Sequence, residues 1–80
     1  MTLADLPRGR WARIAQVRVA GATGDRFAEL GLTAGTSIRV IRHGPFGDPV
    51  QVAVRGFLLA VRRAEATAID VQVDAGGTSG

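Results

Sequence analysis

The chain has 80 residues, so it encodes one domain near the lower size at which a hydrophobic core holds without disulfides or metals. It contains no cysteine, which excludes disulfides, thiolate nucleophiles and thiolate metal sites. All 10 basic residues are arginine, but the net charge is only +3, which by itself establishes neither a nucleic-acid nor a membrane partner.

The apolar residues are too interrupted by charge for a membrane protein. The longest strongly apolar stretch, residues 57–61, is far short of the roughly 20 residues that cross a bilayer. The N-terminus lacks the basic start and apolar run of a secretory signal. We therefore expect a soluble, cytoplasmic protein without direct membrane insertion.

The N-terminal third predicts a lead-in followed by a bent strand. Residues 3–9 carry a proline and a glycine at turn positions, so we expect an extended segment anchored by its two leucines rather than a helix. Over residues 11–19 the apolar alternation breaks once, between Ile14 and Val17, which predicts a strand with a bulge or a strong bend.

A short amphipathic helix is predicted over residues 25–32, after a flexible turn at residues 21–24. Thr23 or Asp25 can cap its first turn. Gly31 ends the helix because glycine readily takes the left-handed conformation of a C-terminal cap, and Leu32 can then fold back as the apolar residue that accompanies such a cap.

The two faces of this helix differ in chemistry. Phe27 and Leu30 share one face, while Arg26 and Glu29 lie on the other. The apolar pair can close an open end of the fold, and the same helix can still offer its polar face and the turn at residues 31–33 to a partner. The sequence leaves both roles open.

The remaining chain predicts four strands. Residues 36–42 alternate, with Ile41 adding an apolar side chain on the outer face, so we expect a central strand covered on both sides. The loop at residues 43–49 has two prolines and two glycines, with Phe46 at its tip. Residues 50–54 and 57–62 form a hairpin joined by Arg55 and Gly56, and a helical turn at residues 64–68 precedes the last strand, residues 69–73.

These elements define a mainly β fold of about five strands with one short α-helix. Short strands, tight turns and a helical turn before the last strand are typical of a small SH3-like β-barrel, with an OB-like barrel as the alternative. We expect the barrel to occupy residues 1–74 and residues 75–80, which are small and polar, to form a flexible tail.

Four separately placed motifs give the chain a resemblance to the FeoA family, the small cytoplasmic accessory proteins of bacterial ferrous-iron uptake. They are Leu-Ala-Asp-Leu-Pro-Arg-Gly at residues 3–9, Arg-Phe-Ala-Glu-Leu-Gly-Leu-Thr-Ala-Gly at 26–35, Gly-Pro-Phe-Gly-Asp-Pro at 44–49 and Leu-Ala-Val-Arg-Arg-Ala-Glu-Ala at 59–66. They fall in the family's order over nearly the whole chain. Phe27 departs from the pattern, in which leucine is common at this place, and so does the glycine-rich tail.

The resemblance implies an SH3-like barrel without enzymatic activity or cofactor. It also implies a partner, the membrane ferrous-iron transporter, contacted through its cytoplasmic GTP-binding domain or its membrane portion. The partner-binding residues that it suggests come from the Leu-Gly-Leu helix end: Arg26, Phe27, Leu30, Gly31 and Leu32.

No catalytic or metal site emerges from the residues themselves. His43 is the single histidine, and a metal site would have to recruit Asp48, Glu29 or Glu65 without any ligand spacing. A serine hydrolase triad lacks a nucleophile elbow around Ser37. The glycines at 21, 24, 31 and 35 lack the Gly-Lys-Ser/Thr ending of a phosphate loop, so nucleotide binding is not expected.

The strongest alternative is a small nucleic-acid-binding β-barrel. Seven arginines lie on or beside predicted strands, at positions 13, 18, 39, 42, 55, 62 and 63. The modest charge and the few aromatic residues available for base stacking argue against it, and the same scarcity argues against a groove for proline-rich peptides. Trp11 is expected to be a partly buried strand residue. No helix-turn-helix supports a metal-responsive repressor, and self-association through an apolar edge stays open.

Overall fold

The computed structural model describes residues 1–73, which form a single five-stranded antiparallel sheet in the order β4-β3-β2-β1-β5. The strands are β1 (Trp11–Val17), β2 (Ser37–His43), β3 (Val50–Val54), β4 (Phe57–Val61) and β5 (Ile69–Val73). The helical elements are η1 (Leu3–Asp5), α1 (Gly21–Glu29), η2 (Pro45–Gly47) and α2 (Arg63–Ala66). The mainly β prediction is confirmed, with β2 at the centre of the sheet. The predicted tail at residues 75–80 lies outside the described residues.

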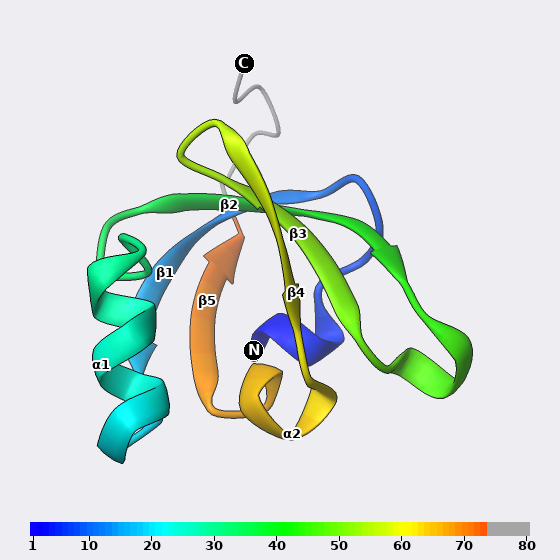
Figure 1. The fold of residues 1–80 in the computed structure, drawn as a ribbon. Coiled ribbons are helices and arrows are strands. Elements are labelled where there is room, and N and C mark those ends of the chain that lie inside the picture. Colours follow the sequence, from blue (N-terminus) through cyan, green and yellow to red (C-terminus); the bar gives the residue numbers. More distant parts are fainter. Residues whose placement is uncertain (74–80) are drawn as a thin grey trace.

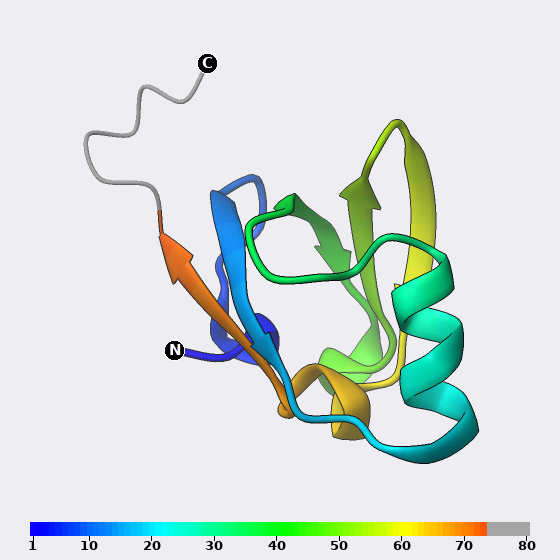
Figure 2. The ribbon, with the colours of Figure 1, turned by 90° about the vertical axis from the view of Figure 1, so that its left-hand side faces the viewer.

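The sheet is strongly curved around the core (Figure 1). Figure 2 shows its edge strands β4 and β5 on opposite sides of the molecule, with α2 low and between them. Helix α1 runs along the open side of the curved sheet (Figures 1 and 2). None of the helices within residues 1–73 combines the length and apolar character needed to cross a bilayer.

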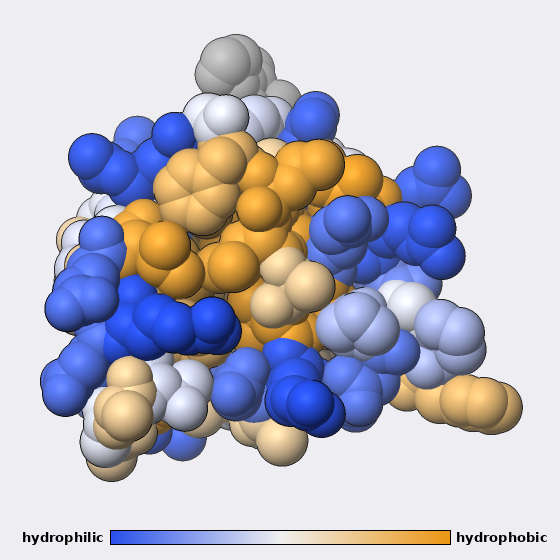
Figure 3. All heavy atoms as spheres, in the orientation of Figure 1, coloured by the Kyte–Doolittle hydropathy of each residue, from blue (hydrophilic) through white to orange (hydrophobic). Residues whose placement is uncertain are grey.

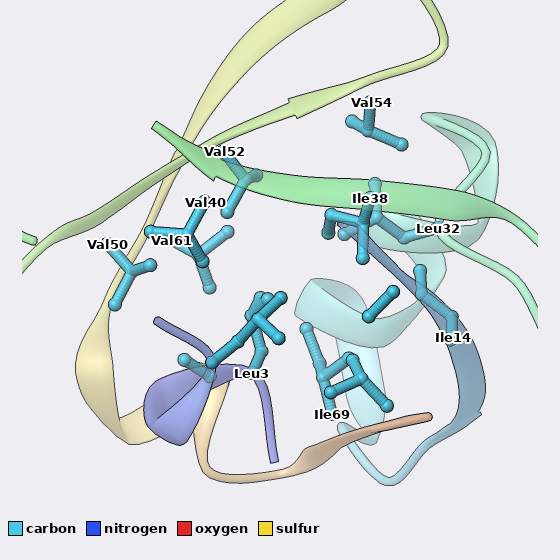
Figure 4. Close-up of a cluster of buried hydrophobic side chains, with 14 of the residues drawn as sticks. Leu3, Ile14, Leu32, Ile38, Val40, Val50, Val52, Val54, Val61 and Ile69 are labelled. Atoms are coloured by element: carbon cyan, nitrogen blue, oxygen red, sulfur yellow. The ribbon is translucent and has the colours of Figure 1, made fainter. Parts of the chain in front are cut away.

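Alternating strand residues build the core (Figure 4). In β3 the valines at 50, 52 and 54 are at most 2% exposed while the residues between them are partly exposed, which is the two-residue period of a half-buried strand. Helix α1 contributes Phe27, the largest fully buried side chain. The two leucines of the N-terminal segment, Leu3 and Leu6, are both 0% exposed, as their anchoring role predicted.

Two bulges bend the sheet. The register of β1 against β5 shifts between Ile14 and Gln16, which confirms the predicted break in β1. A second shift separates Val40 from Arg42 in the pairing of β2 with β3. Ile41 is therefore a bulge residue, partly exposed, and not a sign that β2 is covered on both faces.

Two local predictions near the N-terminus were wrong. The lead-in contains one turn of 3-10 helix, η1, where an extended segment was expected. Helix α1 begins at Gly21, not after residue 24, and neither Thr23 nor Asp25 caps it; its N-cap is Ala20 without a side-chain bond. Gly24 lies inside the helix, and a Cβ there would overlap the carbonyl of Val19, so glycine at this position allows close packing.

The two sheet edges are covered differently. The N-terminal segment lies along β5, where Thr2 forms a bridge with Asp70 and the amide of Val71 donates to the carbonyl of Met1 at 2.9 Å. Within residues 1–73, strand β4 pairs only with β3. The free edge of the sheet is therefore β4.

Candidate interaction site

The C-terminal end of α1 is fixed by a glycine cap. The amide of Gly31 donates to the carbonyl of Ala28 at 3.0 Å, and the amide of Leu32 donates to the carbonyl of Phe27 at 2.9 Å. With φ of +92° at Gly31, this pair of bonds is a Schellman motif. Its apolar partners, Phe27 and Leu32, both lie in the core, which confirms the predicted cap.

The β3–β4 hairpin reaches this helix end through Arg55. The hairpin has the predicted two-residue connection, with φ of +50° at Arg55 and +86° at Gly56, the two left-handed residues of a type I′ turn. The Arg55 side chain lies over Gly31 so closely that a Cβ at position 31 would overlap it. Gly31 thus ends the helix and also leaves room for the arginine of a distant hairpin.

Exposed apolar side chains lie next to this contact. Phe57 and Leu58 are 37% and 60% exposed, and Leu30 and Leu59 are only partly buried against the core. Figure 3 shows a hydrophobic area over β4 and its surroundings, bordered by hydrophilic side chains. An apolar free edge strand of this kind is typical of a surface that another chain covers.

We define the helix–hairpin site as the exposed surface formed where the end of α1 meets the β3–β4 hairpin. Its members are Arg26, Leu30, Gly31, Arg55 and Phe57.

The structure divides the five residues suggested from the sequence into two groups. Phe27 and Leu32 are 0% and 1% exposed, so in this conformation they support the site from the core. Arg26 is exposed, while Leu30 and Gly31 are partly exposed. The Arg26 guanidinium carbon lies 5.8 Å from the centre of the Phe27 ring, over its face.

Sequence reasoning missed the hairpin's share of this surface. Arg55 and Phe57 are far from α1 in the chain, and only the curvature of the sheet places Arg55 over Gly31. A signal existed: five consecutive apolar residues at 57–61 do not alternate, which is unusual for an edge strand with one solvated face. Sequence reasoning interprets this stretch as a hairpin strand and does not connect its apolar character with an interaction surface.

His43 is held by the backbone. Its Nε2 lies 3.0 Å from the carbonyl oxygen of Leu6, so this nitrogen carries the hydrogen and donates. Within residues 1–73 no three histidine, aspartate or glutamate side chains cluster in a way that could hold a metal ion.

Two of the arginines on and beside the strands make contacts within the fold. Arg18 binds both carboxylate oxygens of Asp70, at 2.8 and 2.9 Å, and also donates to the carbonyl of Thr67. Arg39 stacks on Trp11, with its guanidinium carbon 5.2 Å from the ring centre. Trp11 is 37% exposed at the start of β1, in agreement with the prediction of a partly buried strand residue.

The Arg18–Asp70 pair lies at the surface, where its two side chains are 46% and 33% exposed. The hydrogen bond from the Arg18 guanidinium, reinforced by its charge, lowers the pKa of Asp70 below its ordinary value. The pair joins the end of β1 to the start of β5, so its role is structural.

Comparison with known proteins gives consistent matches. The family model of the FeoA domain matches residues 1–73. A fusion of Fe(2+) transport protein A with the Fe(2+) transporter FeoB, from Porphyromonas gingivalis, is 32% identical over 73 residues; the match covers 91% of this chain and only 9% of that protein.

Solved structures agree with the sequence matches. The chain is similar to the FeoA protein of Chlorobium tepidum, with 38% identity and a TM-score of 0.89 over 99% of this chain and 75% of that one. It is also similar to Stenotrophomonas maltophilia FeoA, described as a procaryotic SH3 domain protein complexed with zinc, with 33% identity and a TM-score of 0.76 over 96% and 93% of the two chains. The SH3-like fold is thus confirmed, as a curved sheet with a free β4 edge.

Proposed function

Because this chain belongs to the FeoA family, we propose that it serves ferrous-iron uptake as a non-enzymatic accessory protein that binds the cytoplasmic side of the membrane ferrous-iron transporter. The observation that carries the proposal is the P. gingivalis fusion, in which a domain 32% identical to this chain shares one polypeptide with FeoB. A tether makes the contact between two fused domains intramolecular. Without such a tether, binding depends on the affinity of a surface of the domain.

The helix–hairpin site supplies such a surface. It combines exposed apolar area at Phe57 and Leu30 with the guanidinium groups of Arg26 and Arg55. Aromatic and arginine side chains contribute most of the binding energy in many protein interfaces. The backbone there is held by the glycine cap and the hairpin turn, so little ordering entropy is lost on binding.

The partner is tested by isothermal titration calorimetry of the purified protein against three samples. They are the transporter of the same genome in nanodiscs, its isolated GTP-binding domain and a mixed-sequence duplex oligonucleotide. The proposal expects saturable binding to the full transporter, with or without binding to the isolated domain. Binding to the oligonucleotide alone, weakening steeply with salt as phosphate contacts do, would overturn it.

A second experiment tests whether binding to the transporter affects iron uptake. We expect uptake of radioactive ferrous iron by cells that contain the transporter to change when this protein is removed, and to recover when it is restored. Recovery with a variant that does not bind the transporter in the calorimetry would contradict the proposed role.

A further inference from the structure

Phe46 is the most exposed apolar side chain of the described structure. It exposes 101% of its reference area, at the tip of the loop that joins β2 to β3. Its φ of +58° is a left-handed conformation that bulky residues seldom adopt. The loop projects from the end of the molecule opposite α1 (Figure 1). The fold thus presents an apolar ring to water in a conformation that its own backbone disfavours.

The loop is closed by specific bonds. The amide of Gly44 donates to the carbonyl of Pro49 at 2.8 Å, and the amide of Gly47 donates to the carbonyl of Gly44 at 2.8 Å. The Asp48 carboxylate accepts the amide of Arg63 at 3.0 Å, which ties the loop to the start of α2. The guanidinium of Arg63 also lies over Gly47, where a Cβ would be 2.9 Å from its Nη1. These hydrogen bonds and the contact with Arg63 therefore fix the backbone of the loop that carries Phe46.

Positive charge surrounds the two ends of this loop. A hollow of about 430 Å³ lined by Arg8, Arg42 and His43 opens where the chain leaves β2. A second hollow, of about 370 Å³ and lined in part by Arg62 and Asp48, opens where the chain returns to β3. Within residues 1–73, no ion pair engages the three arginines.

This combination favours one kind of occupant. A single projecting ring fits a concave apolar pocket, and hollows with arginines fit carboxylates that border the pocket. A second copy of this chain fits poorly, because its own apolar surface, the helix–hairpin site, carries Arg26 and Arg55 and would repel the loop. A flat lipid surface would meet the ring but not fill the hollows.

We propose that the Phe46 loop is a second contact with the transporter, resting on the proposed function above. Phe46 enters an apolar pocket on the cytoplasmic side of the transporter, and carboxylates at the rim of that pocket pair with Arg8, Arg42 and Arg62. Because α1 and η2 lie at opposite ends of the molecule (Figure 1), the protein spans two parts of its partner.

The test measures binding of the full chain to the transporter in nanodiscs of zwitterionic lipid. Phe46→Asn removes the ring but keeps a residue that tolerates the left-handed conformation. We expect Phe46→Asn to bind about tenfold more weakly, while the matched variant Phe46→Leu stays close to the wild type. The double variant Arg42→Gln/Arg62→Gln is expected to show a shallower dependence of affinity on salt.

Each result has a defined meaning. Equal affinities of the wild type and Phe46→Asn would overturn the second contact and leave the proposed function intact. No binding by the wild type would instead overturn the proposed function and the second contact with it. Loss of binding of Phe46→Asn to empty nanodiscs with anionic lipid, with unchanged binding to the transporter, would show that the loop's occupant is the membrane and contradict the protein pocket.

Discussion

Two turns of this molecule place an arginine over a glycine, but they treat the neighbouring apolar side chains in opposite ways. At the end of α1, Arg55 lies over Gly31, and the flanking Leu30 and Leu32 are partly or fully buried. At η2, Arg63 lies over Gly47, and the preceding Phe46 is fully exposed. The same contact, an arginine side chain over a glycine, accompanies a buried apolar segment in one turn and an exposed apolar side chain in the other.

The difference between the two turns follows from how each one directs its apolar side chains. The Schellman cap directs the chain back under the helix, so its apolar residues join a core that exists for stability. The η2 loop closes on itself through backbone bonds and contributes no buried side chain. Phe46 therefore has no packing role in the core, and an exposed phenylalanine there calls for a partner.

The sharpest contrast is between two phenylalanines. Phe27→Ala removes the largest fully buried side chain and should lower the free energy of unfolding by about 3–5 kcal/mol. Phe46→Ala removes a fully exposed ring and should change it by no more than about 0.5 kcal/mol. Urea denaturation followed by circular dichroism measures both. Similar losses would contradict the assigned roles of the two regions.

Glycine replacements sharpen the comparison at the helix end. Gly31 and Gly35 both have φ of +92°, but only at Gly31 would a Cβ overlap another side chain, that of Arg55. Both alanine variants should lose about 1–2 kcal/mol through the left-handed backbone, and Gly31→Ala should lose more because Arg55 must move. Thermal unfolding compares them. If Gly31→Ala remained the worse variant in an Arg55→Ala background, contact with Arg55 would not be the reason.

The same substitution at η2 should be milder. In Gly47→Ala the new Cβ meets only the flexible end of Arg63, so we expect a loss of about 1–2 kcal/mol, the cost of the left-handed backbone and close to that of Gly35→Ala. Thermal unfolding again provides the measurement. A loss as large as that of Gly31→Ala would show that the two arginine contacts are equally rigid.

The smallest effect on stability is expected from low pH, through the Arg18–Asp70 pair. Because hydrogen bonding to Arg18 lowers the pKa of folded Asp70, the pair stabilises the fold at neutral pH, and this contribution is lost as the pH falls through the lowered pKa, below the ordinary range of an aspartate. Asp70→Asn should therefore lose less stability than the wild type between pH 4 and pH 2. Urea midpoints across this range test the difference. Parallel curves would mean that the pair does not contribute.

Much of the fold was predictable because its signals are local. Apolar alternation together with the Arg55-Gly56 turn gave the five strands, the irregular spacing before Val17 gave the bulge, and Gly31 gave the end of the helix. The start of α1 was not predictable, since Gly21 and Gly24 have turn chemistry in sequence, and only the structure shows that Gly24 packs against the carbonyl of Val19.

The candidate site was predictable only in part. Arg26, Leu30 and Gly31 are neighbours in sequence, so the helix end could be found from its motif. The burial of Phe27 and Leu32 and the approach of Arg55 depend on how the sheet curves over the helix, which is set by tertiary packing. A local pattern carries no information on that arrangement.

The central claim is that the transporter binds the helix–hairpin site, and one pair of dissociation constants tests it most directly. Leu30→Arg places a charge on this site, whereas Gln72→Arg places the same charge on an exposed position of β5, at the sheet edge opposite β4. With both variants shown to be folded by circular dichroism, the account predicts that Leu30→Arg binds the transporter at least about tenfold more weakly than Gln72→Arg. Equal dissociation constants would contradict it.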